Sequence, residues 1–277
     1  MRKIYIRLWA LIIAYLGLSA PMMVQAATDE ELALANIPLA QELTNPVADL
    51  ISVPIQMNFD QNIGLNDEGE KLTTNIQPVI PFEVNSEWNL ITRTIVPVVY
   101  QEKIVPGDES QSGLGDINLQ LFLSPKKPTS SGLIWGAGAL VLLPTATDTL
   151  IGSEKWGAGP AGVALKIDGP WTYGGLANHV WSFAGNDDRA DISNTFVQPF
   201  AAYTWPSAWT VSVQSESSYN WNREEWSIPV NAAVSKLVFF GKLPVSLQAG
   251  VGRWLETPDA GPEGLRYRLQ ANFVLPK

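Results

Sequence analysis

The sequence of 277 residues has no cysteine and a single histidine. Without cysteine there is neither a disulfide framework nor a thiolate metal site, which suits a chain that crosses an oxidising compartment. One histidine also gives too few ligands for a His-rich metal site. We therefore expect this chain to hold no cofactor and no metal ion.

The sequence has few charged residues and few long apolar runs. Asp, Glu, Lys and Arg make up 16% of the chain, against about 25% in a typical soluble domain. Apolar residues make up 46%, yet after residue 26 no run is long enough for a membrane-spanning helix. This combination is typical of a membrane β-barrel, because lipid-facing and lumen-facing residues alternate along its strands.

Positive charge is also in deficit. Because Arg2, Lys3 and Arg7 precede residue 27, the rest of the chain carries 15 Lys and Arg against 27 Asp and Glu, a formal charge of −12. Such a chain repels phosphate groups, so we expect no nucleic-acid partner.

The first 26 residues have the three-part order of a secretory signal peptide. The three basic residues are followed by the apolar run Leu8–Leu18 and then, after Pro21, by Val24-Gln25-Ala26. Small residues at that point predict cleavage after Ala26, which would leave Ala27 as the mature N-terminus. A single membrane-anchoring helix is the alternative, but the apolar run is short for a span of about 20 residues.

Apolar and polar residues alternate with a period of two in several segments. In the last of them one face carries only apolar or aromatic residues: Leu265, Tyr267, Leu269, Ala271, Phe273 and Leu275. Segments 51–60, 117–123, 226–235 and 245–252 show the same pattern. The period predicts β-strands, and its phase predicts that Leu119, Leu121, Leu247 and Leu269 face lipid.

Counting such segments gives about twelve strands, an even number as bacterial single-chain barrels require. They span 51–64, 70–83, 87–102, 113–124, 132–144, 156–168, 171–184, 191–205, 208–220, 225–238, 243–254 and 264–276. Tight turns such as Asp168-Gly169-Pro170 and Gly241-Lys242 alternate with longer polar links such as 145–155 and 256–263. The sequence therefore predicts an all-β fold, a transmembrane antiparallel up-and-down β-barrel over residues 51–277, with both chain ends on the periplasmic side.

Aromatic residues bracket the apolar faces of two predicted strands. Trp88 and Tyr100 share a face, as do Trp209 and Tyr219. At about 3.3 Å per residue and a tilt near 40°, these spacings project to roughly 25–30 Å, the height of an outer-membrane apolar band. We expect two aromatic girdles.

Prolines inside the predicted strands favour a different fold. Pro54, Pro78, Pro97, Pro160, Pro199 and Pro229 cannot donate to a ladder, and a closed barrel has no edge on which to place them. Each would need a bulge or a local gap. A soluble β-sandwich or a lipocalin-like protein is the alternative, although neither explains outward apolar faces with aromatic ends.

Residues 27–50 precede the first strand. The stretches Glu30–Ala35 and Pro38–Leu43 are typical of a short helix that is too acidic to enter lipid. The segment is either a disordered leader or a helical plug, folded into the lumen or across its periplasmic mouth.

Six stretches carry a resemblance to a known group of proteins: Asn45–Pro54, Asn75–Pro81, Trp88–Thr94, Gly113–Ile117, Leu143–Asp148 and Trp156–Pro160. In these the chain resembles uncharacterised outer-membrane transporter proteins related to those attached to meta-pathway phenol degradation. The resemblance covers essentially all of residues 27–277. It implies a barrel and the passage of small organic molecules, and it brings no mechanism. The chain departs from the usual assembly signal, because Phe273 is followed by four further residues.

An enzyme would need a constellation of catalytic residues. Outer-membrane phospholipases use a His with a nearby Ser and Asn, and here His179 lies near Ser182 and Asn178. No independent spacing supports a nucleophile–base pair, so we expect no enzyme and place His179 in a girdle or in the lumen. The glycines near 113 and 157 open no helix and are expected at strand bends.

The charged residues of the lumen are the candidate functional residues. Alternation places eight polar side chains there: Asp60, Arg93, Asp116, Gln120, Lys166, Glu216, Arg266 and Arg268. Charges in a narrow barrel must pair or be hydrated, so these residues either cross-link a plugged interior or line a polar conduit.

Closure of the sheet makes one specific prediction. The first and twelfth strands must be neighbours, because only closure satisfies edge hydrogen bonds in lipid. Asp60 and Arg266 then lie within ion-pair reach, with Arg268 one step deeper near Asn58. The alternative is that register shear separates them.

The predicted function is an outer-membrane channel for passive or substrate-selective uptake of small organic molecules, aromatic or apolar in character. A closed barrel with a structural or lipolytic role is the alternative. The expected partners are outer-membrane lipids, the barrel-assembly machinery and the small-molecule solute.

Overall fold

The computed structural model describes residues 29–104, 107 and 110–277. The chain divides into two compact units, residues 1–32 and 33–277. Of the first unit only residues 29–32 are described, as the start of helix α2 (Asp29–Glu42). The predicted signal peptide, residues 1–26, lies outside the described residues. Within the described part of the chain, no helix is long and apolar enough to cross a membrane.

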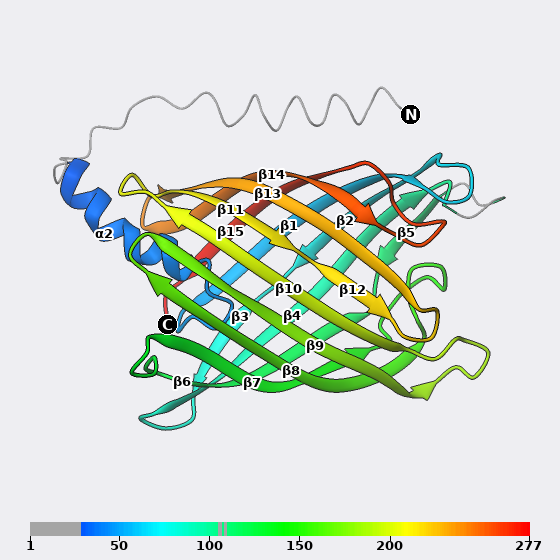
Figure 1. The fold of residues 1–277 in the computed structure, drawn as a ribbon, viewed down its shortest axis with the longest axis horizontal. Coiled ribbons are helices and arrows are strands. Elements are labelled where there is room, and N and C mark those ends of the chain that lie inside the picture. Colours follow the sequence, from blue (N-terminus) through cyan, green and yellow to red (C-terminus); the bar gives the residue numbers. More distant parts are fainter. Residues whose placement is uncertain (1–28, 105–106, 108–109) are drawn as a thin grey trace. The chain divides into compact units, whose positions relative to one another are not determined.

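The second unit is built almost entirely of antiparallel strands (Figure 1). In chain order they are β1 (Ile51–Ile63), β2 (Gly69–Ile76), β3 (Val79–Glu83), β4 (Trp88–Glu102), β5 (Ser110–Leu114), β6 (Ile117–Pro125), β7 (Leu133–Leu143), β8 (Lys155–Asp168), β9 (Trp171–Gly185), β10 (Ser193–Thr204), β11 (Trp209–Ser215), β12 (Ser217–Asn220), β13 (Glu225–Phe240), β14 (Leu243–Glu256) and β15 (Leu265–Leu275).

These elements form one closed sheet of twelve strands. Three pairs, β2–β3, β5–β6 and β11–β12, are each one strand interrupted by a short break. Both members of β2–β3 and of β11–β12 pair with the same two neighbours, and both β5 and β6 pair with β4. The last strand pairs with the first over Ile51–Phe59 and Phe59 lies opposite Tyr267, so no edge is left open. The predicted up-and-down barrel is confirmed.

The six prolines that were difficult to place in a closed barrel lie at or opposite irregularities of the ladder, where no amide donor is needed. Pro54 and Pro78 lie at the β2–β3 break, where Gln77 N donates to Pro54 O at 2.8 Å. Pro97 lies opposite the β5–β6 break. Pro160 falls where the pairing of β8 and β9 skips two positions. Pro199 and Pro229 flank the β11–β12 break on the two neighbouring strands.

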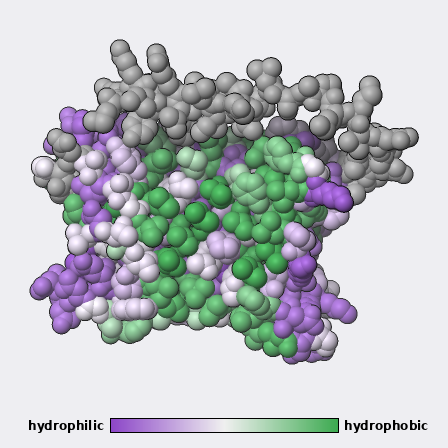
Figure 2. Space-filling view, turned by 180° about the vertical axis from the view of Figure 1, so that it is seen from behind, coloured by the Kyte–Doolittle hydropathy of each residue, from purple (hydrophilic) through white to green (hydrophobic). Residues whose placement is uncertain are grey.

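The outer face of the barrel carries the predicted apolar band. On β6, Leu123 is 43% exposed while its neighbour Phe122 is fully buried, which confirms the alternation. Leu119, Leu121, Leu247 and Leu269 share the outward phase with exposed cross-strand partners such as Ala139 and Ala249. Figure 2 shows hydrophobic residues across the middle of one side and hydrophilic residues at both ends.

Aromatic clusters mark both borders of this band. At the end with the short turns, Trp88 packs edge-on against Trp135, and Tyr203 lies between Trp171 and Trp205. At the end with the long loops, Tyr219 contacts both Trp221 and Trp226, and His179 packs against Trp181. The prediction of two girdles is confirmed, with His179 in one of them.

The two ends of the barrel differ, and we call them the turn end and the loop end. The turn end carries the connections at 84–87, 126–132, 169–170, 205–208 and 241–242, and also the entry to β1 and the exit from β15. The loop end carries the connections at 64–68, 103–109, 144–154, 186–192, 221–224 and 257–264, which include the longest one, 144–154.

The lumen has two unlike walls. Strands β6 to β10 fill one side with a packed apolar cluster that includes Phe122, Leu140, Val163, Leu165 and Leu176. Strands β1, β2 and β11 to β15 present polar side chains to the other side, among them Gln56, Asn58, Asp60, Gln214 and Arg268. The open space of the lumen lies between these two walls.

Candidate functional site

Three cavities lie in line along the barrel from the loop end to the turn end. The first, of about 390 Å³, is bounded by the loops at Ile104, Leu150 and Ala260–Pro262. The second, of about 350 Å³, lies at mid-height, and the third, of about 180 Å³, reaches the segment before β1. Each cavity shares lining residues with the next, so the three adjoin along the lumen, and we call this line of cavities the path.

Two constrictions separate the cavities. Three residues line both the first cavity and the second, and these form the outer constriction: Thr73, Trp254 and Arg266. Five residues line both the second and the third, and these form the inner constriction: Gln56, Gln77, Arg93, Gln198 and Glu216.

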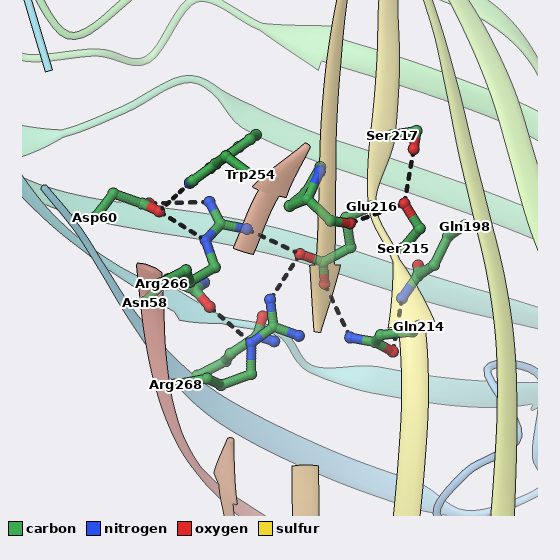
Figure 3. A network of polar contacts seen from close by, with 12 residues as sticks. Asn58, Asp60, Gln198, Gln214, Ser215, Glu216, Ser217, Trp254, Arg266 and Arg268 are labelled. Atoms are coloured by element: carbon green, nitrogen blue, oxygen red, sulfur yellow. Dashed lines mark hydrogen bonds and ion pairs between the residues drawn. The ribbon is translucent and has the colours of Figure 1, made fainter. Parts of the chain in front are cut away.

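An ion-pair network occupies the polar wall beside the outer constriction (Figure 3). Arg266 donates Nε to Asp60 Oδ1 at 2.8 Å and Nη2 to Oδ2 at 2.9 Å, a bidentate pair. Trp254 adds a hydrogen bond from Nε1 to Asp60 Oδ1 at 2.8 Å, and its ring lies 4.4 Å from the Arg266 guanidinium. Two parallel hydrogen bonds fix the orientation of the guanidinium relative to the carboxylate as well as their distance. Both side chains are therefore held along the polar wall.

Glu216 extends this network across the barrel. Its Oε2 accepts from Arg268 Nη2 at 2.6 Å and from Arg266 Nη1 at 3.4 Å, and its Oε1 accepts from Gln214 at 3.1 Å. Arg268 also donates Nε to Asn58 Oδ1 at 2.7 Å. The network therefore ties β15 to β1 on one side and to the β11–β12 break on the other (Figure 3).

The backbone around Glu216 explains its position. It occupies the break between β11 and β12, where the flanking strands contribute Pro199 and Pro229. Proline supplies no amide donor, so the ladder is interrupted on both sides of this residue. The break in the ladder thus lies at Glu216, whose carboxylate accepts hydrogen bonds from Arg266 and Arg268.

Arg93 at the inner constriction differs from the other two arginines. Its Nη2 donates to Gln77 Oε1 at 2.7 Å and its Nη1 to Gln120 Oε1 at 3.4 Å. Among the described residues no carboxylate oxygen lies within 4.0 Å of it. Its hydrogen bonds therefore go to neutral amides, and Glu216 acts on its charge only from beyond hydrogen-bond distance.

The segment before β1 narrows the turn end of the path. Val47 and Ala48 are only 4% and 5% exposed, and Val47 packs into the apolar cluster of the lumen. Asp49 accepts a hydrogen bond from Asn89 at 2.8 Å, and Gln41 of α2 donates to Gly169 O at 2.7 Å. These contacts hold residues 41–49 at the turn end, and the role of this segment as a plug stays a prediction.

Six of the eight predicted lumen residues lie in the lumen. Asp60 with Arg266, and Arg268 with Asn58, are paired as the closure register predicted. Glu216 joins both arginines, and Arg93 contacts Gln120. Whether they line a working pore stays a prediction.

The remaining two require correction. Asp116 is turned to the loop after β7: it accepts from Ala146 N at 3.1 Å and from Ser153 N and Oγ, each at 2.6 Å. Lys166 lies outside the barrel, because its partners across the ladder, Leu133 and Tyr173, are both exposed outward. The odd residues of β8, such as Val163 and Leu165, face inward, so the phase assigned to Lys166 from the sequence was wrong.

The lumen residues that sequence reasoning missed include Trp254, Lys71 and Gln77. Trp254 continues the inward phase of Gln248 on β14 and could have been found by counting further. Lys71 and Gln77 belong to a segment interrupted at Pro78, where alternation is too weak to assign a phase.

His179 lies on the outer face, away from Ser182. Its Nδ1 lies 2.7 Å from Thr195 Oγ1, and its Nε2 lies 3.5 Å from Ser193 Oγ. Ser182 is on the opposite face of β9 and donates to Asp191. In the part of the chain that the structure describes, no carboxylate orients the imidazole.

Comparison with known proteins finds no matching family model and no matching curated protein. Among solved structures, the COG4313 outer membrane channel from Pseudomonas putida F1 is similar, with a TM-score of 0.66 at 13% identity over 82% of this chain and 96% of that one. The NanC porin gives 0.49 at 8% identity, over 82% and 100% of the two chains. The outer membrane phospholipase A from Escherichia coli gives 0.46 at 11% identity, over 86% and 98%. The first similarity supports the fold, and the other two are too distant to carry an argument.

Proposed function

We propose that this protein is an outer-membrane channel for the uptake of small organic molecules. The observation that carries the proposal is the line of three cavities, which share lining residues from the loop end to the turn end. A barrel with a purely structural role would gain stability from a filled lumen, whereas here polar side chains hold a path open beside a packed apolar cluster.

The size and lining of the path favour a small and partly apolar solute. The middle cavity, at about 350 Å³, is near the lower limit of small-molecule pockets. Ile95, Val180 and Phe196 line it on one side, and Asn58 and Asn75 on the other. An aromatic or short aliphatic body fits the first side while its polar group contacts the second. A relation to the meta-pathway phenol proteins is the finer form of this proposal, and it is supported by the sequence motifs alone.

The proposed location follows from the outer surface. The apolar band with aromatic borders suits contact with outer-membrane lipids, with the turn end in the periplasm and the loop end outside. The barrel-assembly machinery is the proposed insertion partner, and it would have to accept a β15 strand that continues beyond Phe273. Cleavage after Ala26 and recovery of the protein in the outer-membrane fraction would support this location. Recovery of uncleaved protein from the soluble periplasm would contradict it.

A lipolytic enzyme is the second candidate, because His179 has a hydroxyl within 3.5 Å at Ser193. A hydrolase needs the base held by a third group, and here Thr195 occupies Nδ1. We propose that this cluster belongs to the girdle and has no catalytic role. Phospholipid hydrolysis by purified protein, lost in His179→Ala, would reverse that assignment.

Single-channel conductance of the refolded full chain in a planar bilayer tests the channel directly. Gln198 lines the inner constriction, whereas Val197 beside it faces outward and is 37% exposed. We expect Gln198→Trp to lower the conductance and Val197→Trp to leave it unchanged. Folded wild-type protein that inserts but carries no current would contradict the proposed function.

A further inference from the structure

The charges along the path do not balance. Both carboxylates at its centre are engaged, Asp60 by Arg266 and Glu216 by Arg268 and Arg266. Two further cations, Lys71 and Arg93, line the path, and in the described part of the chain neither has a carboxylate oxygen within 4.0 Å. A third carboxylate, Glu42, lines the cavity at the turn end. The path and its ion-pair network then hold four cations against three carboxylates, so the lumen is locally positive although residues 27–277 carry a formal charge of −12.

Arg93 has donors to spare. A guanidinium has five N–H groups in a planar fork, and the described residues engage one strongly, through Gln77, and one at 3.4 Å, through Gln120. Arg93 lines the cavities on both sides of the inner constriction, so a solute in either one can reach it. An unpaired guanidinium in a confined polar site favours a planar oxyanion that accepts two parallel hydrogen bonds.

The surroundings of Arg93 define the rest of such a solute. Ile95, Val180 and Phe196 line the loop-side cavity, and Val79 and Phe200 line the turn-side cavity. With about 350 Å³ on one side and about 180 Å³ on the other, the space suits a single ring or a short chain. Lys71 lies in the outermost cavity, where it would attract an anion before it reaches Arg93.

We infer that the inner constriction is a binding site for small organic carboxylates, with the carboxylate on Arg93 and the apolar body against Phe196 or Phe200. The inference deepens the proposed function and rests on it for the claim that the bound solute also passes through. Binding itself does not depend on passage. The apolar wall holds the hydrocarbon part, and the charge of Arg93 sets the preference for an anion over a neutral or cationic analogue.

Calorimetric titration of the folded full chain in detergent tests the site without requiring conduction. Benzoate is the probe, and benzyl alcohol is its uncharged analogue. We expect benzoate to bind more tightly than benzyl alcohol, and Arg93→Gln to weaken benzoate about tenfold or more while leaving benzyl alcohol unchanged. Lys166→Gln removes one positive charge from the outer face and should change neither affinity.

A second variant, Arg93→Lys, keeps the positive charge and loses the planar guanidinium. Its affinity for benzoate should lie between those of wild type and Arg93→Gln. It also replaces Arg93→Gln in the test should that variant not fold.

Reversal potentials in a salt gradient then separate this inference from the proposed function. An open channel should prefer anions, and Arg93→Gln should reduce that preference while Lys166→Gln should not. A channel that conducts but binds benzoate and benzyl alcohol equally, or that keeps its anion preference in Arg93→Gln, overturns the inference and leaves the channel intact. Tight benzoate binding on Arg93 in a protein that never conducts supports the site and contradicts the channel.

Discussion

Asp60 and Arg266 form a bidentate ion pair across the seam where the last strand meets the first, with both contacts shorter than 3 Å. They are 206 residues apart in the chain, and both side chains are largely shielded from water. The pair therefore reports on barrel closure, and it also fixes Arg266 at the outer constriction of the path.

Removal of one partner should destabilise the barrel. Asp60→Ala leaves Arg266 with Glu216, at 3.4 Å, as its remaining carboxylate partner, and breaking a buried pair typically costs about 3–5 kcal/mol. We expect the free energy of unfolding in lipid vesicles to fall by an amount in that range. The double variant Asp60→Ala/Arg266→Ala should lose less than the sum of the two single variants, and simple additivity would show that the pair contributes nothing of its own.

The seam register can be tested by cross-linking, because the chain has no native cysteine. Phe59 lies opposite Tyr267, which places positions 60 and 266 directly opposite each other. Cysteines at these two positions should form a disulfide readily in the folded barrel, since opposite residues have Cβ atoms about 4.5–5.5 Å apart. Efficient linkage of position 60 to a strand other than β15 or β2 would overturn the register.

The assignment of faces on β15 predicts opposite responses at adjacent residues. Leu269 faces outward, where we predict lipid, whereas Gln270 lines the turn-side cavity. Leu269→Arg should cost about 2–4 kcal/mol if it lies near the bilayer midplane, and Gln270→Arg should cost much less. Equal loss of stability in both variants, measured by urea unfolding in vesicles, would show that the phase is wrong.

The loop between β9 and β10 is predicted to loosen in acid. A hydrogen bond from Lys155, then one from Ser182, and the charge of Lys155 lower the pKa of Asp191 below its ordinary value of 3.8. A carboxyl with a lowered pKa in the folded state contributes stability above its unfolded pKa, and that contribution is lost as the pH falls through the folded pKa. Amide exchange in residues 186–192, corrected for its intrinsic pH dependence, should therefore stay slow above pH 4 and rise below it. Asp191→Asn should show fast exchange at every pH, and a wild-type profile in that variant would contradict the assignment.

The plug should control access from the turn end. Val47 belongs to the same buried apolar cluster as Val79, Ile91 and Phe122, so Val47→Asp places a charge in that cluster and should release residues 44–50. We expect a larger single-channel conductance. Pro38→Asp adds the same charge at an exposed position of α2 and is the control. Unchanged conductance in Val47→Asp, together with demonstrated release of the segment, would show that the plug does not limit the path.

The distribution of residue types by itself determined the barrel. A period of two over segments bounded by turns, with apolar faces ended by aromatic residues, leaves few arrangements in which lipid and backbone are both satisfied. The seam contacts of Asp60 and Arg268 followed from the same reasoning, because closure fixes which strands are neighbours and alternation fixes which side chains point inward.

The lumen itself was decided by the tertiary structure. Alternation predicts that Arg93 and Phe122 point inward. It does not predict that polar side chains gather on one wall of the lumen and apolar side chains on the other, because that segregation depends on how strands distant in sequence face each other. The three ladder breaks are also invisible to periodicity: one turns Asp116 toward a loop, and another carries Glu216 to two arginines. Lys166 was misplaced for a related reason, because glycines dilute the pattern of β8 until its phase can be read only from its partners. Pairing can thus be inferred from the chain, and so can the face of a residue where alternation is regular. Which charges have no carboxylate partner, as at Arg93, depends on distances that only the folded barrel sets.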